Sequence, residues 1–168
     1  KLPVISIRIF NAYGTRVRTT GAYGAVFGVF FKQKLANKPF TIVGNGYQKR
    51  DFIYVTDVVE AFFKSAISKV SNEVFNLGAG NPQSINKLVN LIDSKNNKIY
   101  ISKRPGEPNI TWADISKITK MINWKPKINF AKGVRLMLND IHAWKDAPLW
   151  KKDSIEKATQ SWFKYMSS

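Results

Sequence analysis

The chain has 168 residues, an apolar content of 44% and a formal net charge of +16, which is enough sequence for one domain with a hydrophobic core. With no cysteine and one histidine, it cannot form disulfide bonds or a metal site built from Cys or His clusters. No apolar run approaches the ~20 residues of a membrane span, and no signal-peptide pattern is present. We therefore expect a cytoplasmic protein that does not bind membranes.

The high positive charge suggests nucleic acid as a partner, but the choice of lysine over arginine argues against it. Only six of the 27 basic residues are arginines, and arginine is the residue that usually reads bases and phosphates bidentately. The lysines are spread through nearly every segment. We expect a solvated basic surface and no dedicated nucleic-acid site.

The predicted elements alternate between strands and helices from the first residues onward. A strand over Leu2–Phe10 carries β-branched residues and runs into a turn. A helix is predicted where apolar residues recur at helical spacing, at Val26, Phe27, Phe30, Phe31 and Leu35, and it ends at Asn37–Pro39. Two short strands follow in "FTIVGNG" and "FIYV", and later strands are predicted in "EVFNLGAG" and "KIYIS". This alternation predicts an α/β or α+β fold.

Polar residues are placed where the remaining helices should begin. The predicted helix caps are Asp57, Ser84, Asp114, Asn129 and Asp153, the last paired with Glu156 in an acidic variant of the capping box. We expect the five tryptophans to pack in the core rather than stack on a ligand; they are Trp112, Trp124, Trp144, Trp150 and Trp162.

The stretch "VFNLGAGNPQS" admits two interpretations. A strand, a Gly-x-Gly at Gly78 and Gly80, and a helix start are parts of a dinucleotide phosphate loop. The third glycine of that fingerprint is absent, because Ser84 follows Gln83, and no acidic residue lies at the right distance. A tight strand-to-helix turn is therefore favoured.

Two further stretches carry candidate ligand-binding charges. Arg50 and Asp51 stand directly before an apolar strand, and an arginine on such a rigid mount could hold a phosphate bidentately. In "KRPGEP", Pro105-Gly106 predicts a turn that offers the Arg104 guanidinium and a carboxylate a few ångströms apart, a layout suited to a diphosphate beside a ribose. Taken alone, each stretch could equally be an ordinary exposed arginine or a surface turn.

Four separated stretches together resemble one family. In order, "RIFNAYGTR", "GNGYQKRDFIYVTDVVEAF", "FNLGAG" and "RPGEPNITWADISK...NWKP" are similar to the C-terminal half of extended short-chain dehydrogenases/reductases. More narrowly, they resemble the NAD-dependent nucleotide-sugar epimerases and dehydratases of the UDP-glucose 4-epimerase kind. The resemblance covers roughly residues 2 to 135, and the tail after it resembles an extension of some bacterial members.

The resemblance implies the last strands of a Rossmann sheet plus a small C-terminal α/β substrate-binding lobe. It also implies that the N-terminal NAD-binding half is absent from this chain. Residues 1–168 would then form the C-terminal substrate-binding portion, with 2–14 and 72–94 in the Rossmann sheet. Residues 15–71 and 95–168 would belong mainly to the substrate lobe and the C-terminal extension. The strands near Val4–Phe10 and Val74–Leu77 should be neighbours.

Four residues match family positions that bind the diphosphate and ribose of a nucleotide sugar. The resemblance implies that the amide of Asn11 binds the diphosphate region and that Arg50 grips the diphosphate. Arg104 matches a second phosphate arginine, and Glu107 matches a ribose-binding carboxylate, a position where the family often has Asp. We expect these four side chains to line one concave site.

Other matched positions border the cofactor and the base. Ile9 and Phe10 correspond to residues beside the nicotinamide of NAD, the implied cofactor. Val26 and the strand around Ile42 correspond to the walls of the base pocket. The implied partner is a nucleotide-diphosphate sugar, and the full-length enzyme is expected to be a homodimer.

The implied chemistry belongs to a longer enzyme. In the family a Tyr removes a hydroxyl proton while NAD takes hydride from C4 of the sugar, and a Lys lowers the pKa of that Tyr. None of the six tyrosines here has Lys four residues on, so we assign this chain no catalytic residue and expect it to be inactive alone. The alternatives are a 4,6-dehydratase or decarboxylase of the same family, a nucleotide-binding module without catalysis, and a nucleic-acid binder.

Overall fold

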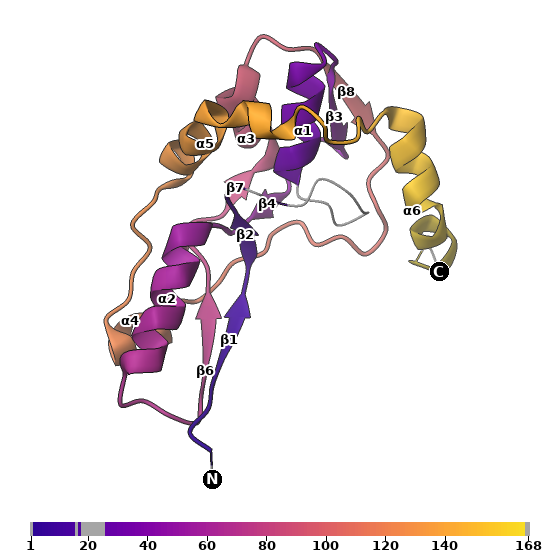
Figure 1. Ribbon diagram of the computed structural model, residues 1–168. Coiled ribbons are helices and arrows are strands. Elements are labelled where there is room, and N and C mark those ends of the chain that lie inside the picture. Colours follow the sequence, from indigo (N-terminus) through magenta and orange to yellow (C-terminus); the bar gives the residue numbers. More distant parts are fainter. Residues whose placement is uncertain (1, 16, 18–25, 167–168) are drawn as a thin grey trace. The chain divides into compact units, whose positions relative to one another are not determined.

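The computed structural model describes residues 2–15, 17 and 26–166 (Figure 1). The chain divides into two compact units: the first is Lys1–Gly14, Lys49–Gln83 and Ile110–Gly133, and the second is Thr15–Gln48, Ser84–Asn109 and Val134–Ser168. This division places residues 49–71 with the N-terminal strand and residues 84–94 in the second unit, whereas the family resemblance assigns 15–71 to the substrate lobe and 72–94 to the Rossmann sheet. Arg16 of the first family motif, and residues 18–25, lie outside the described residues.

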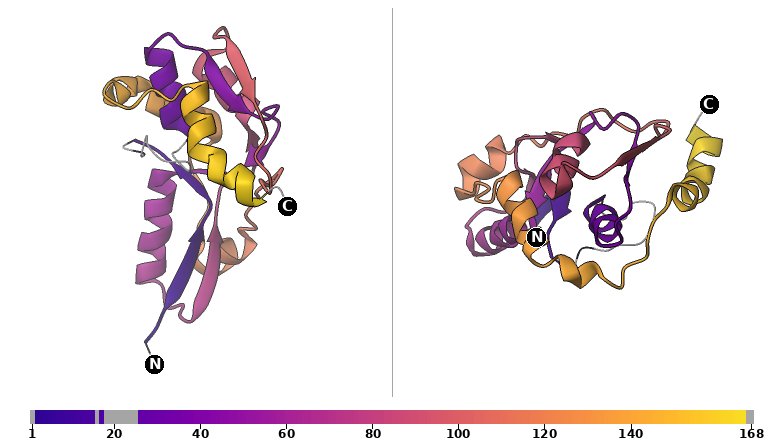
Figure 2. Two further views of the ribbon diagram at one scale, coloured as in Figure 1. Left: turned by 90° about the vertical axis from the view of Figure 1, so that its right-hand side faces the viewer. Right: turned by 90° about the horizontal axis from the view of Figure 1, so that it is seen from above.

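The first unit is built on two parallel strands from distant parts of the sequence. β1 (Ile5–Ile9) pairs with β6 (Glu73–Leu77) in a register that runs from Ile5↔Glu73 to Ile9↔Leu77. Figures 1 and 2 show the two strands side by side and pointing the same way. The prediction that these strands are neighbours is confirmed.

Shorter strand pairs extend this arrangement. β2 (Asn11–Tyr13) pairs in parallel with β5 (Phe52–Tyr54), so that Asn11 lies opposite Phe52. The two-residue strands β4 (Lys49–Arg50) and β7 (Gln83–Ser84) form another pair. Parallel pairing and interspersed helices confirm the predicted α/β class.

Two helices enclose the core of the first unit. α2 (Val55–Ile67) packs against β1, β2 and β5, and α4 (Ser116–Ile122) packs against β6. Between them lies one cluster of buried side chains: Ile53, Val58, Ala61, Phe75, Leu77, Ile118 and Trp124. The opposite side of α2 is also apolar but exposed, with Val59, Phe62, Phe63 and Ile67 facing outward.

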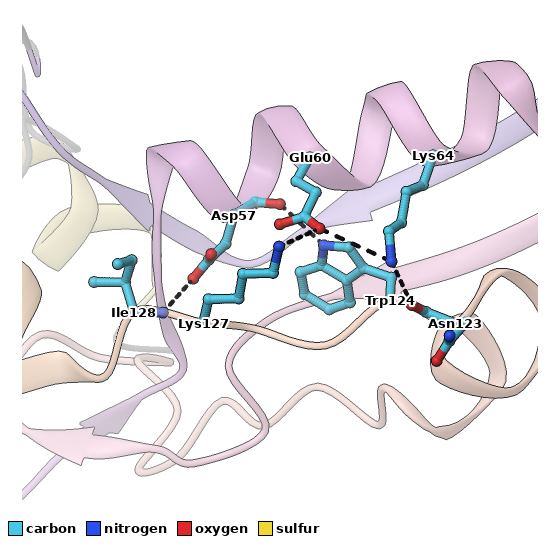
Figure 3. A network of polar contacts seen from close by, with 7 residues as sticks. All are labelled: Asp57, Glu60, Lys64, Asn123, Trp124, Lys127 and Ile128. Atoms are coloured by element: carbon cyan, nitrogen blue, oxygen red, sulfur yellow. Dashed lines mark hydrogen bonds and ion pairs between the residues drawn. The ribbon is translucent and has the colours of Figure 1, made fainter.

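A polar network ties α2 to the segment after α4 (Figure 3). The Ile128 backbone N–H donates to Asp57 Oδ2 at 3.0 Å, and the indole N–H of Trp124 donates to the Asp57 carbonyl at 3.1 Å. Lys127 pairs with Glu60 at 2.7 Å. The prediction that Asp57 caps α2 was wrong, because the helix begins two residues earlier with Tyr54 at the N-cap. Asp57 lies inside the first turn, where its buried carboxylate anchors the neighbouring segment.

Tyr13 is the centre of an aromatic group in the same unit. Its ring makes edge contacts with Tyr54 and Phe130, and its hydroxyl donates to the Phe130 carbonyl at 3.4 Å. Burial raises the pKa of Tyr13, with smaller contributions from Tyr54 and Asp57. Its ring contacts and its hydroxyl bond make Tyr13 a packing residue of this unit.

The second unit has its own parallel pair. β3 (Phe40–Val43) pairs with β8 (Lys98–Ile101), and α1 (Val26–Leu35) packs against β3 and α3 (Ile85–Asp93). The 3-10 helix η1 (Ile141–Trp144) also contacts α1. α5 (Phe130–Asn139) begins in the first unit and ends in the second, and α6 (Lys152–Met166) is the last helix.

A buried amide joins α1 to β3. Gln33 is almost fully buried, donates to the Thr41 hydroxyl at 3.0 Å and accepts from the Thr41 backbone N–H at 3.1 Å. Its Nε2 also donates to the Trp150 carbonyl. Because every partner is polar and in range, the burial of this amide is compensated.

Two of the predicted helix caps are confirmed by their hydrogen bonds. The Ser84 side chain accepts from the Lys87 backbone N–H at 3.1 Å, at the start of α3. Asn129 Oδ1 accepts from the Lys132 backbone N–H at 2.9 Å, at the start of α5. Both side chains satisfy N–H groups that a helix leaves unpaired in its first turn.

The other two caps differ in detail. The pKa of Asp114 is lowered by a hydrogen bond from the Ser116 side chain and, to a smaller extent, by one from the Ser116 N–H at 2.9 Å. The N-cap position itself belongs to Ile115. The Asp153 cap was wrong: Lys151 precedes α6, and its backbone N–H donates to the Ser154 hydroxyl at 2.8 Å. The Ser154 hydroxyl thus bonds the residue before the helix, and Asp153 lies within the first turn.

The tryptophan prediction holds for two of the five residues. Trp124 and Trp144 are buried, whereas Trp150 is half-buried. Trp112 is 66% exposed, because its neighbour Ala113 takes the inward position and the indole N–H donates to the surface carbonyl of Gly80. The Trp162 side chain lies outside the described residues. Among the helices of the described part, none is long and apolar enough to cross a bilayer.

Candidate functional site

Asn11 follows the carboxyl end of β1 and presents its side chain to solvent. Its Oδ1 accepts a hydrogen bond from the Thr111 hydroxyl at 3.1 Å. The same hydroxyl oxygen accepts from the Asp51 backbone N–H at 3.4 Å. These two bonds connect a residue of the N-terminal strand to the Arg50-Asp51 pair and to the segment before α4.

Asp51 is fully buried and lies between β4 and β5. Its carboxylate accepts from three backbone N–H groups: Ala79 at 2.8 Å, Gly80 at 3.1 Å and Ala113 at 2.9 Å. A buried carboxylate is tolerated when several donors replace its water. We refer to Asp51, Ala79, Gly80, Thr111 and Ala113 as the Asp51 cluster.

The Asp51 cluster also settles the interpretation of "NLGAG". A phosphate loop needs backbone N–H groups that are free to face an anion. Here the N–H groups of Ala79 and Gly80 donate to the Asp51 carboxylate, so the protein's own anion occupies that place. A side chain at Gly78 would meet Asp51 Oδ2 at 2.7 Å, and Gly80 has a φ of +66°. The stretch is the predicted tight turn, built around a carboxylate.

Arg50 is half-buried and stands beside this buried carboxylate on β4. Its Nη1 donates to the Lys49 carbonyl at 2.9 Å. Because the next residue is fixed by three hydrogen bonds, the backbone that carries the guanidinium has little freedom. Asn11 and Arg50 thus belong to one unit and are supported by one cluster.

Ile9 and Phe10 lie at the carboxyl end of the first strand of the same unit. Ile9 is the last residue of β1 and is 45% exposed, and the Phe10 N–H donates to the Leu77 carbonyl at 2.9 Å. In α/β sheets the carboxyl ends of parallel strands are the usual place for a bound ligand. Both residues lie at that end of the β1–β6 pair.

Val26 and Ile42 lie in the second unit. Val26 is half-buried at the first position of α1, and Ile42 is fully buried within β3. With no exposed surface, the Ile42 side chain can shape a binding surface only by fixing its neighbours.

Arg104 and Glu107 are the two ends of one turn, as the sequence predicted. The Glu107 N–H donates to the Arg104 carbonyl at 3.4 Å, and Gly106 between them has a φ of +70°. The two side chains line different hollows of the second unit. Arg104 lines one of about 270 Å³ beside α6, with Ile155 among its walls. Glu107 lines another of about 410 Å³, with Tyr47 among its walls.

Asp51 and Thr111, whose side chains make the hydrogen bonds of the Asp51 cluster, were not assigned a binding role from the sequence. The sequence did indicate that Asp51 has a partner, since a charged residue directly before a buried strand needs one. Nothing in the sequence indicated the contacts of Thr111, because its partners Asp51 and Asn11 are 60 and 100 residues away.

The parallel strand pairs, the intervening helices and the ordered motifs define a chain of the extended short-chain dehydrogenase/reductase class. The GDP-mannose 4,6 dehydratase family matches residues 1–137, and the chain belongs to this epimerase/dehydratase family. The chain is 33% identical over 160 residues to a UDP-glucuronate 4-epimerase of Thermodesulfobacterium geofontis, covering 92% of this chain and 45% of the relative.

Two other relatives extend the comparison. A UDP-N-acetyl-alpha-D-glucosaminuronate decarboxylase of Bacillus cytotoxicus is 29% identical over 145 residues, covering 80% of this chain and 44% of the relative. The crystal structure of UDP-glucuronic acid 4-epimerase from Bacillus cereus, in complex with UDP-glucuronic acid and NAD, superimposes with a TM-score of 0.75 and 33% identity. That match covers 83% of this chain and 45% of the solved one. The chain thus spans less than half the length of these relatives.

Proposed function

We propose that the chain is the nucleotide-sugar binding portion of an NAD-dependent sugar epimerase that transfers hydride at C4 of the sugar. The observation that carries the proposal is the support of Asn11 and Arg50 by the buried Asp51 cluster. An amide N–H and a guanidinium are suited to the oxygens of a diphosphate. Fixed donors position the reacting sugar at the far end of the substrate.

The other binding roles follow from the family positions. Arg104 is proposed as a second phosphate ligand and Glu107 as the group that binds the ribose hydroxyls. Their placement at the two ends of one turn, and the exposure left to both side chains, support these roles. Val26 and the strand around Ile42 are proposed to shape the base pocket.

Ile9 and Phe10 are proposed to border the nicotinamide of NAD. The residues fit this role, because Ile9 offers exposed apolar surface at the carboxyl end of β1, and ligand rings are usually held by apolar side chains. NAD supplies the hydride acceptor when it is bound. We place the catalytic Tyr and Lys in the part of the enzyme that this chain does not match, and we propose a homodimer for the full-length enzyme.

Two other functions remain as candidates. The decarboxylase relative and the dehydratase family match favour a 4,6-dehydratase or decarboxylase. A nucleotide-binding module without catalysis is the other candidate, and it would bind the nucleotide without turning it over. The diphosphate site is the same in all three, so product analysis separates them.

The test is an assay of the intact protein that carries this chain. UDP-glucose, UDP-glucuronic acid and UDP-N-acetylglucosamine are each incubated with NAD, and the products are resolved by chromatography. We expect the C4 epimer of at least one substrate. A 4-keto sugar would show that the reaction is dehydration, and released CO₂ would show that it is decarboxylation, in place of epimerisation. UDP binding without turnover would indicate the binding module, and failure to bind UDP would refute the proposal.

A further inference from the structure

We propose that Thr111 is a positioning residue that fixes the side-chain amide of Asn11 for diphosphate binding, an inference that rests on the proposed function. Thr111 lies in the segment before α4 and is half-buried. It touches no substrate in this account and acts through Asn11. Its hydroxyl links the exposed amide to the buried Asp51 cluster.

The direction of the hydrogen bonds sets the orientation of the amide. The Thr111 oxygen accepts from the Asp51 N–H, and its single proton goes to Asn11 Oδ1. Because the hydroxyl gives its one proton to Oδ1, this bond holds the oxygen end of the amide at Thr111. Among the described residues, Asn11 Nδ2 has no hydrogen-bond partner. The donor end of the amide therefore remains available to an anion.

An amide without this support could turn by 180° and present its oxygen to the diphosphate. Two hydrogen-bond acceptors, the amide oxygen and a phosphate oxygen, would then face each other, and one donor would be lost. The Thr111 hydroxyl opposes this reversal, because a reversed amide loses the hydrogen bond from Thr111 to Oδ1 and must share the acceptor side of the hydroxyl with the Asp51 N–H. Orientation of a binding group before the ligand arrives lowers the cost of association.

The support is itself rigid. The Thr111 N–H donates to the Lys49 carbonyl at 3.1 Å, and two residues on, the Ala113 N–H donates to Asp51 Oδ2 at 2.9 Å. Asp51 is fully buried. Thr111 is thus bonded to the residues on either side of Arg50, through its backbone N–H to Lys49 and through its hydroxyl to Asp51. The Asp51 cluster therefore supports both proposed diphosphate ligands.

The test measures UDP affinity of the intact protein by calorimetry. Thr111→Val keeps the shape of the side chain and removes the hydroxyl, whereas Thr111→Ser keeps the hydroxyl. We expect Thr111→Val to weaken UDP binding about three- to tenfold, as for loss of one oriented hydrogen bond, and Thr111→Ser to stay within about twofold. Thr119→Val, on α4 of the same unit, is the matched control and should bind as wild type.

A double-mutant cycle separates positioning from a structural role. In an Asn11→Ala background, Thr111→Val should weaken UDP binding no further. An equal loss in both backgrounds, or wild-type affinity of Thr111→Val, would overturn the inference and leave the proposed function standing. Failure of Thr111→Ser to restore affinity would also overturn it. If the wild-type protein does not bind UDP, the proposed function fails, and the inference fails with it.

Discussion

Gly78 is the position where the packing of the Asp51 cluster leaves no room for a side chain. An alanine Cβ there would lie 2.5 Å from the Ala113 Cβ and 2.7 Å from Asp51 Oδ2, far inside ordinary van der Waals contact. Neither neighbour can retreat freely, because the Asp51 carboxylate is held by three backbone N–H groups, one of them from Ala113 itself. We therefore expect Gly78→Ala to destabilise the protein by straining the cluster.

The magnitude follows from two contributions. Overpacking a filled site costs about 1–3 kcal/mol, and weakening a hydrogen bond to a charged group costs about 1.5–3 kcal/mol. Because the two overlap, we expect a total of about 3 kcal/mol, which lowers the Tm of a domain of this size by about 6–12 °C. The assay is thermal unfolding followed by circular dichroism.

Gly44→Ala is the control for the Gly78 variant. Gly44 has a φ of +64°, but the nearest atom to an added Cβ is 3.6 Å away. This variant measures only the left-handed backbone penalty of about 1–2 kcal/mol. A loss of stability in Gly78→Ala no larger than in Gly44→Ala would refute the close packing of the Asp51 cluster.

Three further predictions concern other contacts. In the intact protein, Arg50→Ala should raise the KM for a UDP-sugar by about 10- to 100-fold, because a charged hydrogen-bond partner is lost. Arg135→Ala, on the exposed side of α5, should leave steady-state kinetics unchanged, and equal effects would remove Arg50 from the site. Trp124→Phe should cost about 1–3 kcal/mol in urea unfolding, because the Asp57 carbonyl loses its indole donor, and an unchanged midpoint would contradict this. The pKa of Asp93 is lowered, chiefly by its hydrogen bond from Lys34, so its stabilisation is present above the ordinary Asp pKa and is lost as the pH falls through the lower folded value. Lys34→Ala should raise the pKa of Asp93 measured by NMR titration, and an unchanged pKa would contradict this pairing.

Much of the fold was predictable because local patterns decided it. A β-branched run predicted β1, the stretch "EVFNLGAG" predicted β6 as a strand before a turn, and their pairing followed from the family motifs. Ser84 and Asn129 cap helices as predicted, since capping depends on residues three positions away. The errors at Asp57 and Asp153 arose because both helices begin before the acidic residue, α2 at Val55 and α6 at Lys152. Helix ends are the least certain part of a sequence pattern.

The support of the candidate site was less predictable. Arg50 could be singled out from its place before a strand, but the bonds that hold Asp51 come from residues 28, 29 and 62 positions away. The exposure of Trp112 likewise depends on which of two adjacent residues, Trp112 or Ala113, faces inward. Such choices are made by tertiary packing and leave no periodic signal in the sequence.

The most direct test of the central claim is a crystal structure of the intact protein with UDP bound. We predict that oxygens of the diphosphate accept hydrogen bonds from Asn11 Nδ2 and from the Arg50 guanidinium, with the Thr111 hydroxyl still on Asn11 Oδ1. UDP bound elsewhere, with Asn11 and Arg50 both facing solvent, would contradict the account.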